Sequence, residues 1–200
     1  MYDFTNPVAN LINELRKIPG IGTKSAQRIA FHLLKTDKDR VMALANAISN
    51  AMEKTRFCRI CNNITELDVC EICSGSDRDN KKICVVEEPF NILSIERTGL
   101  YRGKYHVLAG NLSPVRGVGP DELKIDSLER RLGPEGIEEV IIATSPTIEG
   151  NATAIFIYDL LKGRGVKITR IAMGLPIGAD LDYVDSVTIA KSFEGRVEFK

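Results

Sequence analysis

Several features that would indicate a function at once are missing from this sequence. Its 27 basic and 27 acidic residues cancel, so the whole chain has no net charge for attracting a polyanion. No apolar run approaches the roughly 20 residues that span a bilayer, and the start lacks the basic-then-apolar pattern of a signal peptide. A Gly-x-x-x-x-Gly-Lys-Ser/Thr motif is also absent, which argues against ATP hydrolysis. We therefore expect a cytoplasmic protein that makes no membrane contact.

The neutral total hides an uneven distribution of charge. Residues 1–57 hold nine Lys or Arg against five Asp or Glu, whereas residues 58–80 hold two against five. Residues 81–200 are nearly balanced, at sixteen against seventeen. The basic excess therefore lies at the N-terminal end, where it is compatible with a nucleic-acid partner but too small to establish one.

Cysteine is scarce, with five residues in all, yet four of them form two Cys-x-x-Cys pairs. Cys58 pairs with Cys61 and Cys70 with Cys73, and the eight residues between the pairs suffice for a short hairpin. Zinc prefers four thiolates in a tetrahedron, and four protein ligands leave no open position for catalysis. We therefore predict one structural zinc ion over two disulfides, an iron–sulfur cluster or four unrelated cysteines. The fifth cysteine, Cys84, lies in an apolar run and is expected to be a buried small side chain.

Three helices are predicted in the N-terminal segment from the spacing of apolar residues. The first covers residues 7–18, the second is capped by Thr23 or Ser25, and the third by Asp37 or Asp39. The apolar faces are Val8, Leu11, Ile12, Leu15 and Ile18 in the first, Ala26, Ile29, Ala30, Leu33 and Leu34 in the second, and Val41, Leu44, Ala45, Ile48 and Met52 in the third.

The first two helices are joined by a Pro-Gly-Ile-Gly run at residues 19–22, the pattern of a helix-hairpin-helix motif. The two glycines permit left-handed backbone and close approach, and unpaired N–H groups at the next helix start are a ready phosphate site. Lys24 and Arg28 lie four residues apart, on one face beyond the hairpin. We predict that Gly20, Gly22, Lys24 and Arg28 bind the DNA backbone without reading its sequence. The alternative is an ordinary helical turn with two solvated cations.

From residue 81 onward, strand-type and helix-type apolar patterns alternate. Such alternation predicts parallel strands covered by helices on both faces, with the chemistry at the carboxyl ends of the strands. The expected strands are 83–86, 105–108, 140–143 and 167–173, and the expected helices are 91–98, 121–132, 150–161 and 181–193. Polar residues follow two of these strands, at 87–88 and at 144–150.

These two strand ends resemble the Toprim fold of topoisomerases and primases. Catalytic members carry Asp-x-Asp-x-Glu-Gly at the later turn, where the two Asp side chains hold magnesium, an ion that requires hard oxygen ligands. Here Ser145 and Thr147 stand at the Asp positions, and only Glu149 and Gly150 match. We therefore predict that this domain neither cuts nor synthesises nucleic acid. Glu87 and Glu149 would hold at most a weak ion or contact a protein partner.

The order of a helix-hairpin-helix, a four-cysteine zinc finger and a Toprim domain is similar to that of the RecR family of bacterial recombination mediators. The resemblance covers essentially the whole chain and includes Asn-Leu-Ser-Pro at 111–114, Gly-Val-Gly-Pro at 117–120, Ala-Thr-Ser-Pro-Thr-Ile-Glu-Gly-Asn-Ala-Thr-Ala at 143–154 and Arg-Ile-Ala-Met-Gly-Leu-Pro-Ile-Gly at 170–178. The chain departs from the family at Ser145 and Asn151, where Asn and Glu are usual.

The resemblance implies a multidomain α+β protein. Residues 1–57 would form a helical helix-hairpin-helix region that binds DNA, and 58–80 a small four-cysteine zinc finger. Residues 81–173 would form an α/β Toprim domain with a mostly parallel sheet. Residues 174–200 would form a C-terminal segment with a Walker-B-like motif, used in oligomerisation rather than in ATP hydrolysis.

The resemblance also implies a non-catalytic function in DNA repair. Family members bind single- and double-stranded DNA with RecO or RecF. They help to load RecA recombinase onto strands coated by single-stranded-DNA-binding protein, at gaps and breaks. Some form ring-like homotetramers, in which Lys24 and Arg28 match the positions that grip DNA. RecO docking is expected on the acidic Toprim face, at Glu149 and Glu87, and the protein would be associated with the bacterial nucleoid.

Two other classes of function stay open at this point. One is a metal-dependent Toprim enzyme, such as a nuclease, topoisomerase or primase, against which the missing Asp-x-Asp counts. The other is a zinc-stapled scaffold that binds only protein and therefore predicts no DNA retention.

Overall fold

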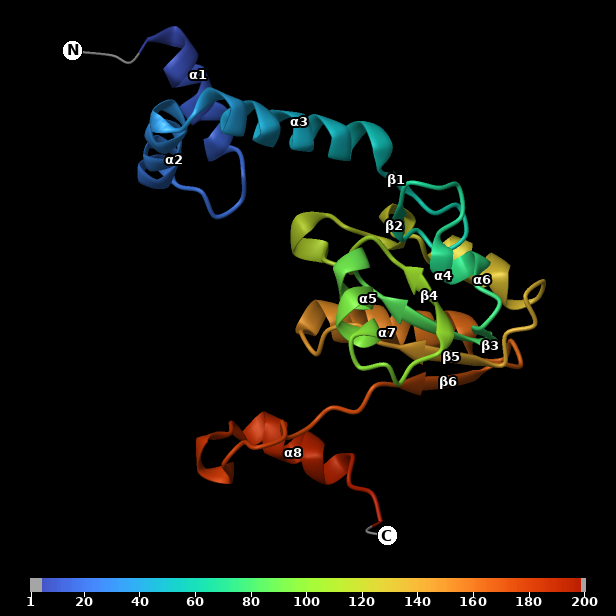
Figure 1. Cartoon of the computed structure of the whole chain (residues 1–200). Coiled ribbons are helices and arrows are strands. Elements are labelled where there is room, and N and C mark those ends of the chain that lie inside the picture. The colour runs from blue at the N-terminus through green and yellow to red at the C-terminus, as the bar shows by residue number, and fades with distance from the viewer. Residues whose placement is uncertain (1–4, 199–200) are drawn as a thin grey trace. The chain divides into compact units, whose positions relative to one another are not determined.

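The computed structural model describes residues 5–198, so the ends of the expected first and last segments, 1–4 and 199–200, lie outside the described part. The chain divides after Thr55 into two compact units. The first unit is helical, and the second contains a cysteine-rich loop region, a sheet with its helices, and a C-terminal segment (Figure 1).

The first unit contains the helices α1 (Asn6–Arg16), α2 (Thr23–Lys35) and α3 (Lys38–Lys54). Its small core consists of Ile12 from α1 with Ala26 and Ala30 from α2, all buried. Small alanines on one face of α2 let the two helices approach closely, and partly buried apolar side chains from α1 and the hairpin surround them. The predicted pairing of α1 with α2 through an apolar face is confirmed.

The third helix, α3, begins where it was predicted, but its apolar face is not buried as expected. Asp37 caps it, with its Oδ1 accepting a hydrogen bond of 3.0 Å from the N–H of Asp39. No residue of α3 is buried, so its predicted apolar face contributes nothing to the core of this unit. The large apolar side chains exposed along it are Met42, Leu44, Ile48 and Met52.

A four-stranded parallel sheet forms the centre of the second unit. Its strands are β3 (Asp79–Val86), β4 (Gly103–Val107), β5 (Glu139–Ile142) and β6 (Lys167–Arg170), in the order β4-β3-β5-β6 (Figure 1). The predicted parallel sheet is therefore confirmed, although the strands begin and end at slightly different residues from those expected.

Both faces of the central strand β3 are covered, because alternate side chains point to opposite sides of a sheet. Ile83 and Val85 pack in one core with α6 (Ile125–Leu132) and α7 (Ile148–Leu161), whereas Cys84 and Val86 pack in another with α5 (Pro89–Glu96). Cys84 is thus buried as predicted, and burial raises the pKa of its thiol to about 12.

The order of the strands determines where a site can form. From β3 the chain passes through α5 to β4 on one side, and then through α6 to β5 on the other side of β3. At such a reversal the carboxyl ends of neighbouring strands leave a crevice, which is where open α/β sheets bind ligands. In this sheet that reversal lies between β3 and β5, at the residues that follow these two strands.

Two predicted elements are interrupted. The expected helix 121–132 consists of a 3-10 turn (Pro120–Glu122) and α6, because the N–H of Lys124 bonds to the carbonyl oxygen of Leu108 at the end of β4. The expected strand 167–173 stops at Arg170, where its neighbour β5 also ends.

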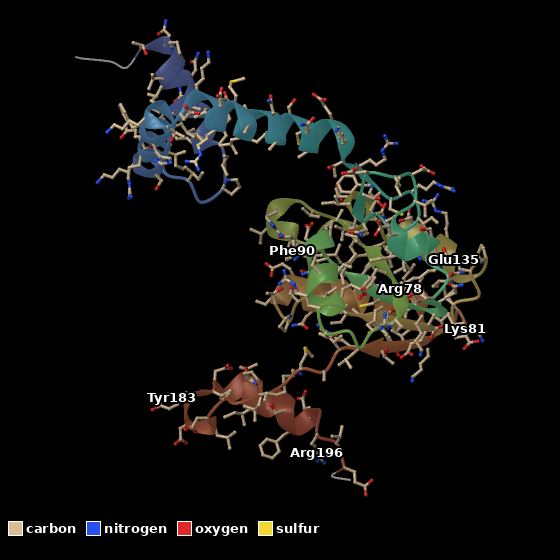
Figure 2. The ribbon with its side chains drawn as sticks, in the orientation of Figure 1. Arg78, Lys81, Phe90, Glu135, Tyr183 and Arg196 are labelled. Carbon is tan, nitrogen blue, oxygen red and sulfur yellow. The ribbon has the colours of Figure 1, made fainter. Side chains whose placement is uncertain are left out.

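The C-terminal segment was predicted as one helix over 181–193, and this was wrong. A 3-10 turn (Leu181–Tyr183) is followed by extended backbone and then by α8 (Ser186–Glu194), which Asp185 caps by accepting from the N–H groups of Val187 and Thr188. No residue of the described range 174–198 is buried. Tyr183, for example, is 90% exposed (Figure 2).

Candidate functional site

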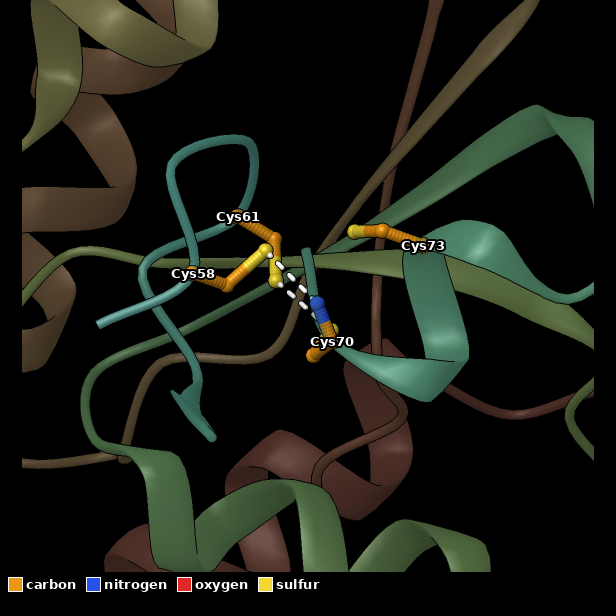
Figure 3. A group of neighbouring side chains, drawn as sticks. All are labelled: Cys58, Cys61, Cys70 and Cys73. Atoms are coloured by element: carbon orange, nitrogen blue, oxygen red, sulfur yellow. Dashed lines mark hydrogen bonds between the residues drawn. The ribbon is translucent and has the colours of Figure 1, made fainter. Parts of the chain in front are cut away.

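The four predicted metal ligands converge in the loop region that opens the second unit. β1 (Arg56–Phe57) and β2 (Ile64–Thr65) form an antiparallel hairpin around the first pair, and α4 (Glu71–Ser74) carries the last cysteine. The hairpin therefore encloses Cys58 and Cys61, rather than lying between the two pairs as expected. The Sγ atoms of Cys58, Cys61, Cys70 and Cys73 all lie within 4.8 Å of one another and are buried (Figure 3).

This arrangement fits a zinc ion. Four sulfur atoms about 2.3 Å from zinc in a tetrahedron are about 3.8 Å apart, and the Sγ atoms of Cys61 and Cys70 lie 3.5 Å apart. The N–H of Cys70 donates to the Sγ of Cys58 over 3.3 Å (Figure 3), a contact that favours a thiolate. Hydrogen bonds from the thiols of Cys61 and Cys73 lower the pKa of Cys70 to about 2. This shift favours the thiolate of Cys70, the form in which a cysteine binds a metal.

The cysteine loop is attached to the edge strand β4 by one backbone hydrogen bond and by a side-chain amide. The N–H of Val107 in β4 donates to the carbonyl oxygen of Cys61 over 2.8 Å. The next residue, Asn62, has left-handed backbone with a φ of 61°, and its side-chain amide donates to the carbonyl oxygen of Val107 and to the Ser127 hydroxyl. Sequence reasoning missed Asn62, although an Asn directly after Cys-x-x-Cys is a signal for such a turn.

Next to this attachment lies a buried polar network. The Nε2 of His106 lies 2.8 Å from the carbonyl oxygen of Lys124, so this nitrogen must carry the proton, and its Nδ1 accepts from Arg131 over 3.1 Å. Arg131 also donates to the carbonyl oxygen of Tyr105 and pairs with Glu135. Burial, with the Arg131 charge beside the ring, lowers the pKa of His106 to about 4. The imidazole is therefore neutral and structural at ordinary pH.

A second side-chain cluster joins the exit from the cysteine region to the first helix of the sheet domain. The guanidinium of Arg78 donates to both carboxylate oxygens of Glu96 in α5, at 2.9 and 2.6 Å (Figure 2 labels Arg78). Arg78 lowers the pKa of Glu96, and the hydroxyl of Tyr105 donates to the same carboxylate. The Arg78–Glu96 pair is mostly shielded from water. Because the Glu96 carboxylate of α5 also contacts Tyr105 of β4, these contacts hold α5 against the sheet.

The predicted DNA-binding residues lie at the hairpin between α1 and α2. Gly20 has a φ of +82°, which favours glycine, but Gly22 has extended backbone with a φ of −81° and is itself the cap of α2. The expected side-chain cap at Thr23 or Ser25 is therefore wrong. Within the described residues, the N–H groups of Thr23, Lys24 and Ser25 have no acceptor, as expected at an uncovered helix start.

The two predicted cations stand close to this helix start. Lys24 and Arg28 are both exposed, and in the described part of the chain neither forms an ion pair. By contrast, the nearby Lys17 forms an ion pair with Glu14, with 2.8 Å between its Nζ and the Glu14 Oε1. The structure thus brings uncovered amides and two uncompensated cations to one end of α2.

The carboxyl ends of β3 and β5 meet as the topology requires. Glu87 follows β3, and its Oε1 accepts from the N–H of Ser145 at 3.1 Å and from the Ser145 hydroxyl at 2.8 Å. The Ser145 hydroxyl also lies 3.2 Å from that of Thr147, which caps α7 by accepting from the N–H of Gly150. A Cβ on Gly150 would lie 2.1 Å from the carbonyl oxygen of Ser145, so glycine is required there.

This cluster differs from a magnesium site. Where catalytic Toprim proteins have two carboxylates, the Ser145 hydroxyl bonds to Glu87, and the Thr147 hydroxyl lies against that of Ser145 and caps α7. In residues 5–198, the four cysteines are the only group of three or more His, Cys, Asp or Glu side chains close enough to share a metal. Glu149 is half-buried at the start of α7. Asn151, the other departure from the family, accepts a hydrogen bond of 2.7 Å from Arg170.

None of the helices within residues 5–198 combines the length and the apolar character that a membrane span requires.

Comparison with protein families assigns each part of the chain. Residues 8–52 match the helix-hairpin-helix of RecR, 55–75 the four-cysteine zinc finger domain of RecR, 81–172 the Toprim domain, and 174–197 the C-terminal region of RecR. The four cysteines are accordingly the site of one structural zinc ion.

Curated relatives match over nearly their full length. A recombination protein RecR of Heliobacterium modesticaldum is 52% identical over 195 residues, covering 98% of both chains. A recombination protein RecR of Koribacter versatilis is 50% identical over 198 residues, covering 99% of this chain and all of the relative. A third, from Thermobifida fusca, is 51% identical over 193 residues, covering 96% of this chain and 97% of the relative.

Proposed function

The chain belongs to the RecR family of recombination proteins, and on this premise we propose that it is a DNA-binding mediator that catalyses no reaction itself. The observation that carries the proposal is the end of α2, where uncovered N–H groups lie beside the unpaired Lys24 and Arg28. Amides and cations together bind phosphate oxygens, and since neither reads a base edge, the binding is independent of sequence.

The test reverses the two charges. Lys24→Glu combined with Arg28→Glu should abolish retention of DNA in a gel-shift or anisotropy assay, while zinc content and the melting temperature stay unchanged. The parent protein should lose affinity steeply as salt rises, because its contacts release counterions from phosphates. The matched control is Lys54→Glu combined with Lys162→Glu, which makes the same change of charge at two other exposed positions. Unchanged DNA affinity in the Lys24/Arg28 variant would contradict the proposal and favour a scaffold that binds only protein.

The main competitor is a metal-dependent Toprim enzyme. Ser145 and Thr147 replace its two aspartates, and the carboxylate of Glu87 accepts both polar hydrogens of Ser145. We therefore propose that no magnesium ion is needed for function. Magnesium-dependent nicking or primer synthesis that disappears in Glu87→Gln would decide for the enzyme instead.

The partners follow from the family resemblance. We propose that RecO or RecF binds the Toprim face and that the complex loads RecA onto strands coated by single-stranded-DNA-binding protein, at gaps and breaks. Glu149 is the acidic contact that we assign to RecO, with the neighbouring Ile148, which is 84% exposed. Because the Glu87 carboxylate is held by Ser145, we assign it to positioning this turn rather than to contact. Glu149→Lys should abolish RecO pull-down without affecting zinc content.

Exposed apolar surface supports self-association. The side chains of α3 and of residues 174–198 are nowhere buried in the described chain, yet they include Leu44, Ile48, Met52, Tyr183 and Phe193. Exposed apolar patches of this kind mark protein–protein contacts. We propose a homo-oligomer, up to a tetrameric ring, in the bacterial cytoplasm and near the nucleoid. Mass measurement in solution with and without DNA tests it, and a monomer under both conditions would contradict it.

A further inference from the structure

Positive charge on α2 does not end with the residues at the hairpin. The helix contains no Asp or Glu, and its basic side chains are Lys24, Arg28, His32 and Lys35. Successive residues turn by about 100° around a helix, so these four fall within an arc of about 80°. All four are exposed, whereas Ala26 and Ala30 on the opposite side are buried against α1. We call this arc the basic stripe of α2.

The surface is hollowed on both sides of the middle of the basic stripe. A hollow of about 610 Å³ is lined by Lys24, Gln27, Arg28, Phe31, His32 and Lys35. A second hollow, of about 340 Å³, is lined by Ser25, Arg28, Ile29 and His32. Arg28 and His32 therefore form a ridge between two depressions, and an elongated partner can lie along the helix instead of touching only its first turn.

The charges of the basic stripe are not compensated within the described chain. Neither Lys24, Arg28 nor Lys35 forms an ion pair there, whereas Lys17, Lys81 and Lys162 elsewhere each pair with a carboxylate. A line of unpaired cations is complementary to a line of anions. From Lys24 to Lys35 the helix rises about 16 Å, a length that spans more than one phosphate of a strand lying along it.

From these observations we propose that a DNA strand runs along the whole of α2, and that His32 and Lys35 are further backbone contacts. The inference rests on the proposed function, because it extends the site at the hairpin. The phosphate chemistry is the same in single strands and duplexes. A purely structural alternative is that Lys35 and His32, in the last turn of α2, interact only with the negative end of the helix dipole.

The experiment measures DNA affinity against salt for Lys35→Gln and for His32→Gln, with a duplex and a single strand of equal length as probes. Each lost cation–phosphate contact lowers the slope of log affinity against log salt by about 0.9 on duplex and about 0.7 on single strands. We expect this decrease for Lys35→Gln and a three- to tenfold weaker affinity for each variant. Lys54→Gln, an exposed lysine outside the basic stripe, is the matched control and should behave like the parent.

The outcomes separate this inference from the proposed function. If Lys35→Gln and His32→Gln bind DNA with the parental slope and affinity, the inference fails, and a lower melting temperature alone would assign them to the helix dipole. An equal effect of Lys54→Gln would mean nonspecific charge and would also overturn it. If the Lys24/Arg28 variant itself binds DNA normally, the proposed function fails first. A decrease on one probe only would show which form of DNA follows the helix.

Discussion

Ser145 holds the carboxylate of Glu87 from two groups at once, its backbone N–H at 3.1 Å and its hydroxyl at 2.8 Å from the same Oε1. The two residues are 58 positions apart and belong to the turns after β3 and β5. The Glu87 carboxylate, which was expected to hold at most a weak ion or contact a partner, thus joins two strand ends. The turn into α7, with Glu149 on it, takes its shape from this contact.

Removing the Ser145 hydroxyl should therefore loosen the turn. Ser145→Ala deletes one donor to a half-buried carboxylate, and we expect a loss of about 1–2 kcal/mol in the free energy of unfolding, measured by denaturant titration. Amide exchange should become faster in residues 145–150. Thr188→Ala, which deletes an exposed hydroxyl bonded to Asp185, is the control and should leave that turn unchanged. Unchanged exchange in Ser145→Ala would show that the backbone contact alone holds Glu87.

The two hairpin glycines should respond differently to substitution. Gly20→Ala places a side chain on backbone with a φ of +82°, at a cost of about 1–2 kcal/mol, whereas Gly22→Ala fits its φ of −81° and meets no atom within 4 Å. Melting temperatures of the two variants test this prediction. Gly22→Ala should nevertheless weaken DNA binding, since its methyl group would stand beside the uncovered amides. Equal destabilisation by both substitutions would contradict the conformational argument.

Loss of zinc should destabilise the edge of the sheet next to the cysteine loop. In Cys58→Ala or Cys70→Ala, the loop can no longer hold the carbonyl oxygen of Cys61 in place for the N–H of Val107. We expect faster amide exchange at Val107, lower solubility and a lower melting temperature, because the cysteine loops fold only with their metal. DNA affinity of the remaining folded protein should be unchanged, since no ligand belongs to α2. Cys84→Ala is the control for loss of a buried thiol that binds no zinc. A zinc-free variant that is stable and exchanges normally would refute this.

Acid should destabilise the protein through His106. Its pKa is lowered from the usual 6.5 to about 4 in the folded state, so the stability it contributes is complete above pH 6.5 and is lost as the pH falls toward 4. A difference of this size corresponds to about 3 kcal/mol. Unfolding free energies of the parent and of His106→Gln, measured across this pH range while zinc retention is monitored, should differ in slope. Parallel curves would exclude His106 as the cause.

The parts of the structure that sequence could predict are those encoded locally. Cys-x-x-Cys spacing and the helix-hairpin-helix pattern involve neighbouring residues, and alternating apolar runs predicted the parallel sheet. Contacts between distant residues were not predictable. The hydrogen bond from the N–H of Lys124 to the carbonyl oxygen of Leu108 interrupts the expected helix 121–132. The two hydrogen bonds from Ser145 hold the Glu87 carboxylate, which was expected to hold an ion or contact a partner. The apolar face of α3 was correctly recognised, but periodicity does not say whether the face is covered by its own chain.

The exposed apolar side chains of α3 and of residues 174–198 have a thermodynamic consequence. Segments with no fully buried side chain gain little hydrophobic stabilisation from folding alone, so most stabilisation of this kind must come from a second molecular surface. If that surface is another copy of the chain, folding and assembly become one equilibrium, and the melting temperature rises with protein concentration. For these segments, dilution would then act as a denaturant.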